Sequence, residues 1–567
     1  MSDPQENQLS PEESSVKSAR SIESDESTVL KEAQNKVEEK PSSKPPSLWK
    51  SAMFIAGVTM IAKALGFFRD WQIFHVYGAS LATDAYFAAV QLPWYSVILL
   101  GGLGGPFHSM VVALFGKWVT APNAPSKQVN QLASAFTILV GVLFVGLSVL
   151  TYGFAEPIMR LFLSDSKPEL LALAAQQLKI LAPMVFFGGW LGIFYGFLNI
   201  YHHFLWPSLS PAAMSVVIII ALALQKAPDQ GQILAWATVG GALAQLLIQL
   251  PAVWGFGWRP ALPDWKPLLP ELKQLGEMII PLVIGTTIGQ VMVYVDMAFV
   301  SQLEEGGWAA VILSNRLMQL PIGVLQTAML VPIFPRFSRA VADKNWDGLR
   351  QDIHTGVITL WVISIPVLVA IVLLGEPIIR LVFEHGEFSR HDTAMVTLAL
   401  VFQALQMVPY FARDTLTRVF YAFEDAKTPM LIGLLAIGIK YGLNMLLVKQ
   451  FGLGGITLST ALITAINMTL LGSILYAKHF KNYGPMLLLK RLGLLLSAGA
   501  GVFVIFYVMR PFWLPYTLPN AFLWQQWVSV MALGVSILAL YWLMASVLRI
   551  PEMKALNGRL MSVLNRG

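Results

Sequence analysis

Long apolar stretches follow one another from residue 51 towards the C-terminus, each near the length that crosses a lipid bilayer. Polar or Pro/Gly-containing connectors separate them. Inside hydrocarbon every backbone polar group must be paired, and no alternating barrel pattern is present, so we expect helices. The predicted fold is an all-α polytopic membrane protein with about 14 spans: 51–74, 85–115, 131–154, 177–200, 206–225, 231–256, 276–301, 308–334, 354–374, 393–422, 429–449, 455–477, 488–509 and 524–547.

Composition agrees with this class. The 567 residues are 56% hydrophobic and 13% charged, whereas an average soluble domain carries about 25% charge. The formal net charge of +6 is modest and fits Lys and Arg in cytoplasmic loops better than affinity for nucleic acid. The chain has no cysteine, which excludes disulfides and thiolate metal sites.

The first 50 residues differ from the rest. They are rich in Ser, Glu, Lys and Pro, and residues 1–47 have no aromatic side chain, so we expect a disordered tail. More Lys and Arg fall in the connectors on the tail's side of the membrane than on the other side, which predicts a cytoplasmic N-terminus. An even number of spans returns the C-terminal tail, residues 551–567, to the same side.

Three short motifs recur in the same order at a nearly constant spacing. They are Glu156–Leu161 and Glu376–Leu381, Gln91–Pro93 and Gln319–Pro321, and Phe194–Phe197 and Phe420–Phe423. About six spans fill one period, which predicts two parallel six-helix repeats that form two lobes with a substrate site between them. The predicted parts are 51–275 and 276–485 for the lobes and 486–550 for two appended helices.

Charged residues occur inside the predicted spans of both halves. A charge at mid-bilayer costs roughly 2.5–3.5 kcal/mol on insertion scales, so each one needs a partner or water. Arg forks bind phosphate or carboxylate bidentately, and a cationic, water-filled cavity would accept an anionic substrate. The charged residues are Lys63, Arg69, Asp70, Asp84, Asp296, Arg316, Arg413, Asp414, Arg418 and Lys440.

Structural alternatives exist for the residues near the span ends. Arg69 and Asp70 could form a snorkelling pair at the membrane interface. Asp84 follows Thr83 just before an apolar run and could be a helix cap. Arg316 lies too deep in its span for easy snorkelling.

The charges of the second half have similar alternatives. Asp414 and Arg418 are four residues apart on one helical face and could satisfy each other, with Arg413 beside them. Asp296 and Lys440 could neutralise each other between helices.

Several blocks resemble the MurJ (MviN) family. They are Leu65–Asp70, Ala82–Phe87 with Leu92 and Pro93, Asn315–Val324, and Arg418–Ala422. The resemblance implies a lipid II flippase of the multidrug/oligosaccharidyl-lipid/polysaccharide exporter superfamily, with fourteen helices in all, of which the last two are C-terminal additions to the two lobes. Such a protein moves undecaprenyl-diphosphate-disaccharide-pentapeptide from the cytoplasmic to the periplasmic leaflet of the bacterial inner membrane by alternating access.

The resemblance also implies roles for residues. The cavity cations of the family fall on Lys63, Arg69 and Arg316, and their acidic partners on Asp70 and Asp84. The family usually has Arg shortly after the Leu-Pro of its second helix, but residues 94–99 here contain none. Arg413 is a candidate to compensate.

Some members of the family bind sodium, and the matching positions are Asp296, Lys440, Asn444, Ile456 and Thr460. Lys440 stands where Asn is common. Our hypothesis is that its ammonium takes the place of a metal cation, pairs with Asp296, and leaves no sodium site.

Enzymatic function has little support. The chain has no GxxxxGK[ST] motif, no HExxH motif and no recognisable nucleophile–base pair, so we expect a transporter without a cofactor or metal. Lipid II, membrane lipids and the cell-wall synthesis machinery are the expected partners. The alternatives are a polysaccharide-lipid or drug exporter of the same superfamily and a non-transporting cell-envelope scaffold.

Overall fold

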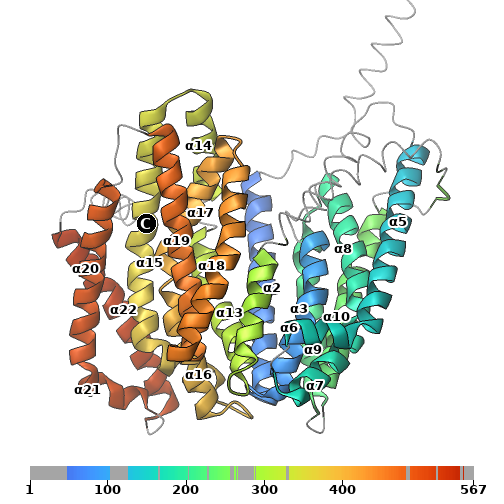
Figure 1. The fold of residues 1–567 in the computed structure, drawn as a ribbon, viewed down its shortest axis with the longest axis horizontal. Helices are drawn as coiled ribbons and strands as arrows, with labels where there is room; N and C mark the ends of the chain where they lie inside the picture. Colours follow the sequence, from blue (N-terminus) through green and yellow to red (C-terminus); the bar gives the residue numbers. More distant parts are fainter. Residues whose placement is uncertain are drawn as a thin grey trace, which may run out of the picture. The chain divides into compact units, whose positions relative to one another are not determined.

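The computed structural model describes residues 48–101, 126–163, 166–201, 203–225, 229–255, 261–263, 265, 287, 289–326, 331–480, 486–518, 521–548 and 553. Residues 1–60 form one unit, of which only the start of helix α2 is described, and residues 61–567 form another. Most of both predicted tails and the first half of the predicted span 276–301 lie outside the described residues. The helices described below belong to the second unit, except for the start of α2. This unit is helical and without strands wherever it is described (Figure 1).

Ten described helices are long and apolar enough to span a membrane, or up to eleven if a bent pair counts as one span. The all-α polytopic class is therefore confirmed, and the number fourteen stays a prediction. The division into lobes at 275/276 and 485/486 also stays a prediction.

The first half contains nine described helices. Proline divides the predicted span 177–200, because Pro183 has no N–H to continue the hydrogen bonding of the preceding helix. Helix α3 packs against α7 and α8, α5 packs against α8, and α9 packs against α10. The helices are α2 Leu48–Tyr77, α3 Leu81–Gly101, α5 Ser126–Gly153, α6 Ala155–Phe162, α7 Pro168–Leu181, α8 Pro183–Ile200, α9 Leu205–Ala223, α10 Gln232–Leu247 and α11 Leu250–Gly255.

The second half begins, as far as it is described, with the helical segment Gly289–Val300. The predicted span 393–422 is two helices, α16 and α17, which meet at a bend of 46°. The helices are α13 Gly307–Leu325, α14 Val331–Ala342, α15 Trp346–Phe383, α16 Arg390–Ala404, α17 Met407–Ala422, α18 Lys427–Phe451 and α19 Leu453–His479.

The appended segment consists of α20 Met486–Val508, α21 Arg510–Trp513, the short 3₁₀ helix η2 Leu514–Thr517, and α22 Leu523–Val547. Helices α20 and α22 pack against each other and against α15.

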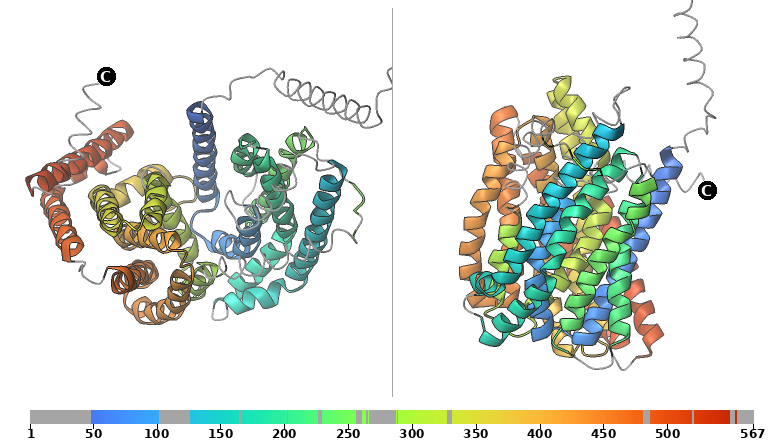
Figure 2. Two further views of the ribbon diagram at one scale, coloured as in Figure 1. Left: turned by 90° about the horizontal axis from the view of Figure 1, so that it is seen from above. Right: turned by 90° about the vertical axis from the view of Figure 1, so that its right-hand side faces the viewer.

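The helices of the two halves form separate groups, α5 and α8–α10 in the first half and α15–α19 in the second (Figure 2).

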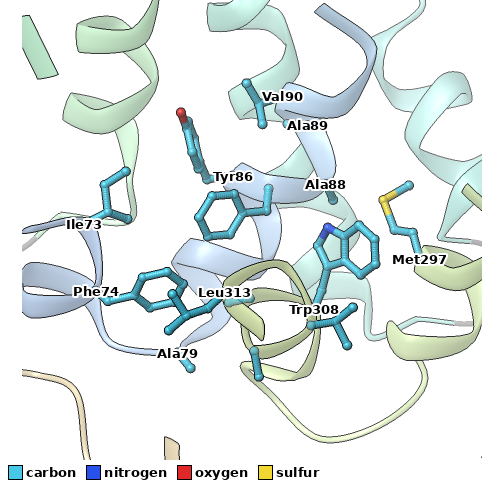
Figure 3. Packing of buried hydrophobic residues seen from close by; sticks show 14 of the residues in the cluster. Ile73, Phe74, Ala79, Tyr86, Ala88, Ala89, Val90, Met297, Trp308 and Leu313 are labelled. Atoms are coloured by element: carbon cyan, nitrogen blue, oxygen red, sulfur yellow. The ribbon is translucent and has the colours of Figure 1, made fainter. Parts of the chain in front are cut away.

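Helices of the two halves meet where the turn 78–80 joins α2 to α3, which we call the turn end. Aromatic rings make this joint: Phe74 of α2 packs edge-on against Phe383 and Phe388 of the second half. Trp308, near the start of α13, packs beside Met297 and Ala88 (Figure 3). The joint is apolar and buried, so it holds α2, α3 and α13 in register around the site described next.

Candidate functional site

A cavity of about 520 Å³ lies among α2, α3, α9, α13 and the segment Gly289–Val300. Residues at helical spacing line it, because positions three or four apart share one face of a helix. From α13 these are residues 308, 311, 312, 315, 316 and 319, and from α3 they are 86, 87, 90, 91 and 94. Arg69 and Ile73 of α2, Met214 of α9, and Gln290, Val293 and Asp296 complete the lining.

Arg69 and Arg316 share one carboxylate, that of Asp70. The Arg69 guanidinium donates to Asp70 Oδ1 from Nε at 3.0 Å and from Nη2 at 2.8 Å, and Arg316 Nη1 forms an ion pair with the same oxygen. The Arg316 guanidinium also lies 5.0 Å from the centre of the Phe87 ring, in cation–π geometry. Two guanidinium groups thus face one cavity with a single carboxylate between them.

The snorkelling alternative for Arg69 and Asp70 is wrong. Their side chains are 16% and 10% exposed, and they are enclosed by the second half, which supplies Arg316. Snorkelling requires a charged group that reaches the water at the membrane surface, whereas these groups reach an internal cavity.

Asp84 does not line the cavity, contrary to its predicted role there. Its two carboxylate oxygens accept hydrogen bonds from the backbone N–H of Gly306 at 2.7 Å and of Ala309 at 2.8 Å. Asp84 is therefore a helix cap, as the alternative held, but the helix that it caps is α13 in the other half and not its own. Both carboxylate oxygens of Asp84 are therefore engaged by backbone N–H groups and do not point into the cavity.

Gly306 makes this contact between the halves sterically feasible. Its φ of +82° is in the left-handed region, where glycine is favoured. A β-carbon at this position would collide with the carbonyl oxygen of Ala79. Two further bonds close the turn end: Leu81 N–H donates to Glu305 at 3.0 Å, and Ala79 N–H donates to Asp392 at 3.3 Å.

Lys63 and Arg413 are also absent from the cavity lining. Lys63 is exposed, and its ammonium lies beside Gly323 of α13. The Arg413 guanidinium lies 4.7 Å from the centre of the Tyr410 ring. Neither side chain contacts the Arg69–Arg316 cluster among the described residues, so the structure separates these two cations from the cavity.

The Asp414–Arg418 alternative is confirmed. Arg418 Nε lies 3.2 Å from Asp414 Oδ2, one helical turn away on α17. Gln326 at the end of α13 donates to the same carboxylate at 3.4 Å. This ion pair satisfies itself and has no part in the cavity.

The predicted pairing of Asp296 with Lys440 is confirmed. Lys440 Nζ lies 3.1 Å from Asp296 Oδ1 and donates to Thr460 Oγ1 at 2.6 Å. Asn444 Nδ2 donates to Asp296 at 3.0 Å, and Ser459, which the sequence did not single out, donates to Asn444. The Lys440 side chain is 2% exposed. The absence of sodium at this position stays a prediction.

Sequence reasoning missed the uncharged polar residues of the cavity, which are Gln91, Gln290, Asn315 and Gln319. Asn315 and Gln319 lie one residue before and three residues after Arg316, so helical spacing from a known cavity residue would have found them. Gln91 and Gln319 begin the repeated Gln-Leu-Pro motif, which was a second signal.

The cavity is closed towards the turn end. Along α13, the lining residues nearest that end are buried, with Trp308 3% and Val311 8% exposed. Asn315 and Gln319, further along the same face, are exposed. The accessible part of the cavity therefore faces away from the turn end.

The described helices and the charged cavity among them define a polytopic helical membrane protein, and solved structures share its fold. The lipid II flippase MurJ in an inward closed conformation matches with a TM-score of 0.70 at 21% identity, over 88% of this chain and 98% of that one. An inward-facing multidrug resistance MATE transporter of the MOP superfamily matches with a TM-score of 0.57 at 16% identity, over 76% and 100% of the two chains. These likenesses show the shared fold.

Sequence comparison defines the family. Residues 73–525 match the family described as lipid II flippase MurJ. A probable lipid II flippase MurJ from Synechocystis sp. is 30% identical over 75% of this chain and 80% of its own length. A lipid II flippase MurJ from Burkholderia cenocepacia is 24% identical over 75% of this chain and 83% of its own length. The chain belongs to the MurJ family.

Proposed function

We propose that this protein is a lipid II flippase, a transporter and not an enzyme, which carries the polyprenyl-diphosphate-linked peptidoglycan precursor across the inner membrane. The observation that carries the proposal is the cluster in which Arg69 and Arg316, from the two halves, share Asp70 at the wall of one cavity. A diphosphate has enough acceptor oxygens to engage both guanidinium forks while Asp70 keeps them in place.

The charge balance of the site favours an anion. The cavity wall, together with the residues that form ion pairs with it, has one more cation than carboxylates. The cations are Arg69, Arg316 and Lys440, and the carboxylates are Asp70 and Asp296. A transporter of cationic drugs would need the opposite balance. The remaining positive charge and the unused guanidinium N–H groups suit a phosphorylated headgroup.

We propose transport by alternating access, and the way the two halves are joined supports it. Asp84 of α3 holds the N-terminus of α13 through two backbone N–H groups at the turn end, where the cavity is closed. We infer that release of this cap accompanies opening at the turn end, because the first turn of α13 must then move away from α3. The Lys and Arg distribution supports a periplasmic turn end with both termini in the cytoplasm.

The test is complementation of a flippase-depleted bacterium with wild type, Arg69→Ala and Arg316→Ala. A charge-assisted hydrogen bond contributes roughly 1.5–3 kcal/mol, so we expect each variant to slow appearance of the precursor at the outer leaflet about 10- to 100-fold. The measurement is the accessibility of the lipid-linked precursor to a reagent added outside the membrane.

Arg160→Ala is the matched control. Arg160 pairs with Glu156 on the exposed surface of α6, with side chains 66% and 59% exposed, so its loss leaves the cavity intact. We expect wild-type transport from this variant. Normal transport by Arg316→Ala at equal membrane abundance would contradict the flippase and favour a scaffold.

A further inference from the structure

The cavity holds four carboxamide side chains besides its charges. Gln91 comes from α3, Gln290 from the segment Gly289–Val300, and Asn315 and Gln319 from α13. None of the four amide groups has a hydrogen-bond partner within the described part of the chain. A carboxamide offers two N–H donors and an acceptor oxygen, so each of these groups has unused hydrogen-bonding capacity directed at whatever fills the cavity.

Gln91 and Gln319 are equivalent positions of the internal duplication. Each begins a Gln-Leu-Pro motif, and each lies on the helix, α3 or α13, that contributes most of its half's residues to the cavity lining. The duplication thus presents the same functional group to one cavity from both halves. The charged residues do not share this symmetry, because Arg316 has no cationic counterpart at the corresponding part of α3.

Proline offers a purely structural explanation, which the contacts do not support. Pro93 and Pro321 each lack an N–H and leave a carbonyl of the preceding turn without its helical donor. A glutamine two residues before the proline lies only two positions after that carbonyl, on a different face of the helix, and is poorly placed to donate to it. Neither Gln91 nor Gln319 makes such a bond among the described residues, so their amides remain available to a ligand.

We propose that Gln91 and Gln319 form a two-sided carboxamide clamp for the uncharged, amide- and hydroxyl-bearing part of the substrate headgroup. The clamp rests on the proposed function, in which Arg69 and Arg316 hold the diphosphate. Acetamido and hydroxyl groups of a sugar, or peptide amides, pair with carboxamides in both directions, whereas a bare diphosphate would use only the N–H donors. One ligand held from both halves also connects headgroup recognition to the relative movement of α3 and α13.

Binding of three probes to the purified full-length protein in detergent tests the clamp. The probes are undecaprenyl diphosphate, the same lipid bearing the disaccharide, and the lipid bearing the disaccharide-pentapeptide. Two neutral hydrogen bonds predict that Gln91→Met combined with Gln319→Met weakens binding of the complete headgroup about 10-fold, with each single variant contributing part of the loss. The affinity of the double variant for undecaprenyl diphosphate should stay within about 2-fold of wild type, a difference smaller than the energy of one hydrogen bond.

The disaccharide probe separates the two sources of the hydrogen-bonding groups. A loss already present with the disaccharide assigns the clamp to the sugars, and a loss that needs the pentapeptide assigns it to the peptide. The clamp is refuted if the double variant binds all three lipids like wild type, or if it loses undecaprenyl diphosphate to the same degree.

Two controls separate this inference from the proposed function. Gln351→Met makes the same substitution at an exposed position of α15, away from the cavity lining, and should bind all probes like wild type. Arg316→Ala should weaken all three probes; if it leaves undecaprenyl diphosphate binding unchanged, the proposed function itself fails, whatever the glutamine variants do. Gln91→Asn with Gln319→Asn withdraws both amides by one methylene and replaces the methionine pair if that pair does not fold; the same selective weakening of the complete headgroup is then expected, and unchanged binding of all three probes refutes the clamp.

Discussion

The two ion clusters beside the cavity each pair a carboxylate with cationic side chains, but in different surroundings. Around Asp70, the side chains of Arg69 and Arg316 are 16% and 34% exposed, and their guanidinium groups face the cavity. Around Asp296, the Lys440 side chain is 2% exposed, and its ammonium donates to Asp296 and Thr460. The first cluster can accept an anion because its cations have unused donors and access to water, whereas the second holds its cation in place.

A third pair provides an exposed reference. Asp425, in the connection between α17 and α18, lies 3.2 Å from Lys478, whose side chain is 51% exposed. The three carboxylates therefore form a series in which the cationic partner becomes steadily more accessible to water. The free energy lost when the carboxylate is removed should fall as the cation becomes more accessible to water. We therefore expect Asp296→Ala to destabilise the protein most, Asp70→Ala less, and Asp425→Ala least.

The largest effect is expected from Asp296→Ala. It leaves the Lys440 ammonium buried without a counter-ion, which typically destabilises a protein by about 3–5 kcal/mol. Thermal unfolding in detergent, followed by tryptophan fluorescence, measures the loss. Asp296→Ala combined with Lys440→Met removes the stranded charge and should recover most of the midpoint; a double variant no more stable than the single one would show that the ion pair is not the cause.

A smaller loss is expected from Asp70→Ala, roughly 1–3 kcal/mol, because Arg69 and Arg316 keep access to water in the cavity when their shared partner is removed. The same unfolding assay measures it. Binding of undecaprenyl diphosphate should persist, since both guanidinium groups remain. A destabilisation as large as that of Asp296→Ala would contradict the distinction between the two clusters.

The smallest effect belongs to Asp425→Ala. The side-chain and backbone hydrogen bonds from Thr428, helped by Lys478, lower the pKa of Asp425 to about 2. An exposed ion pair contributes roughly 0–1 kcal/mol and a capping hydrogen bond of this kind typically about 1 kcal/mol, so we expect a loss of about 1 kcal/mol. The folded pKa is below the unfolded value of about 3.9, so the contribution is present above pH ~4 and is lost as the pH falls towards 2.

Unfolding midpoints of wild type and Asp425→Ala measured side by side test the sign. Their difference should be constant from neutral pH down to about pH 5 and should shrink between about pH 4 and pH 2, between the unfolded and folded pKa values. A difference that grows as the pH falls would mean that the carboxylate is not stabilised in its charged form.

Much of this protein follows from its sequence alone. Apolar runs of spanning length require paired backbones, so the helical membrane class was predictable from hydropathy. Charges inside such runs are costly without partners, which is why Arg69, Arg316, Asp296 and Lys440 were recognisable as members of internal clusters. The MurJ-like blocks near Asp70 supplied the family.

Tertiary structure decided which of these groups share a site. Local sequence does not determine how each helix is rotated about its axis, and that rotation takes Arg413 away from the cavity lining and brings Gln91 and Gln319 into it. Asp84 caps α13, a helix from the other half, and a contact across so much of the chain leaves no local pattern. The charged residues could be recognised from sequence because a charge inside an apolar span is energetically costly wherever it lies. Their partners could not, because these depend on packing between helices that are distant in sequence.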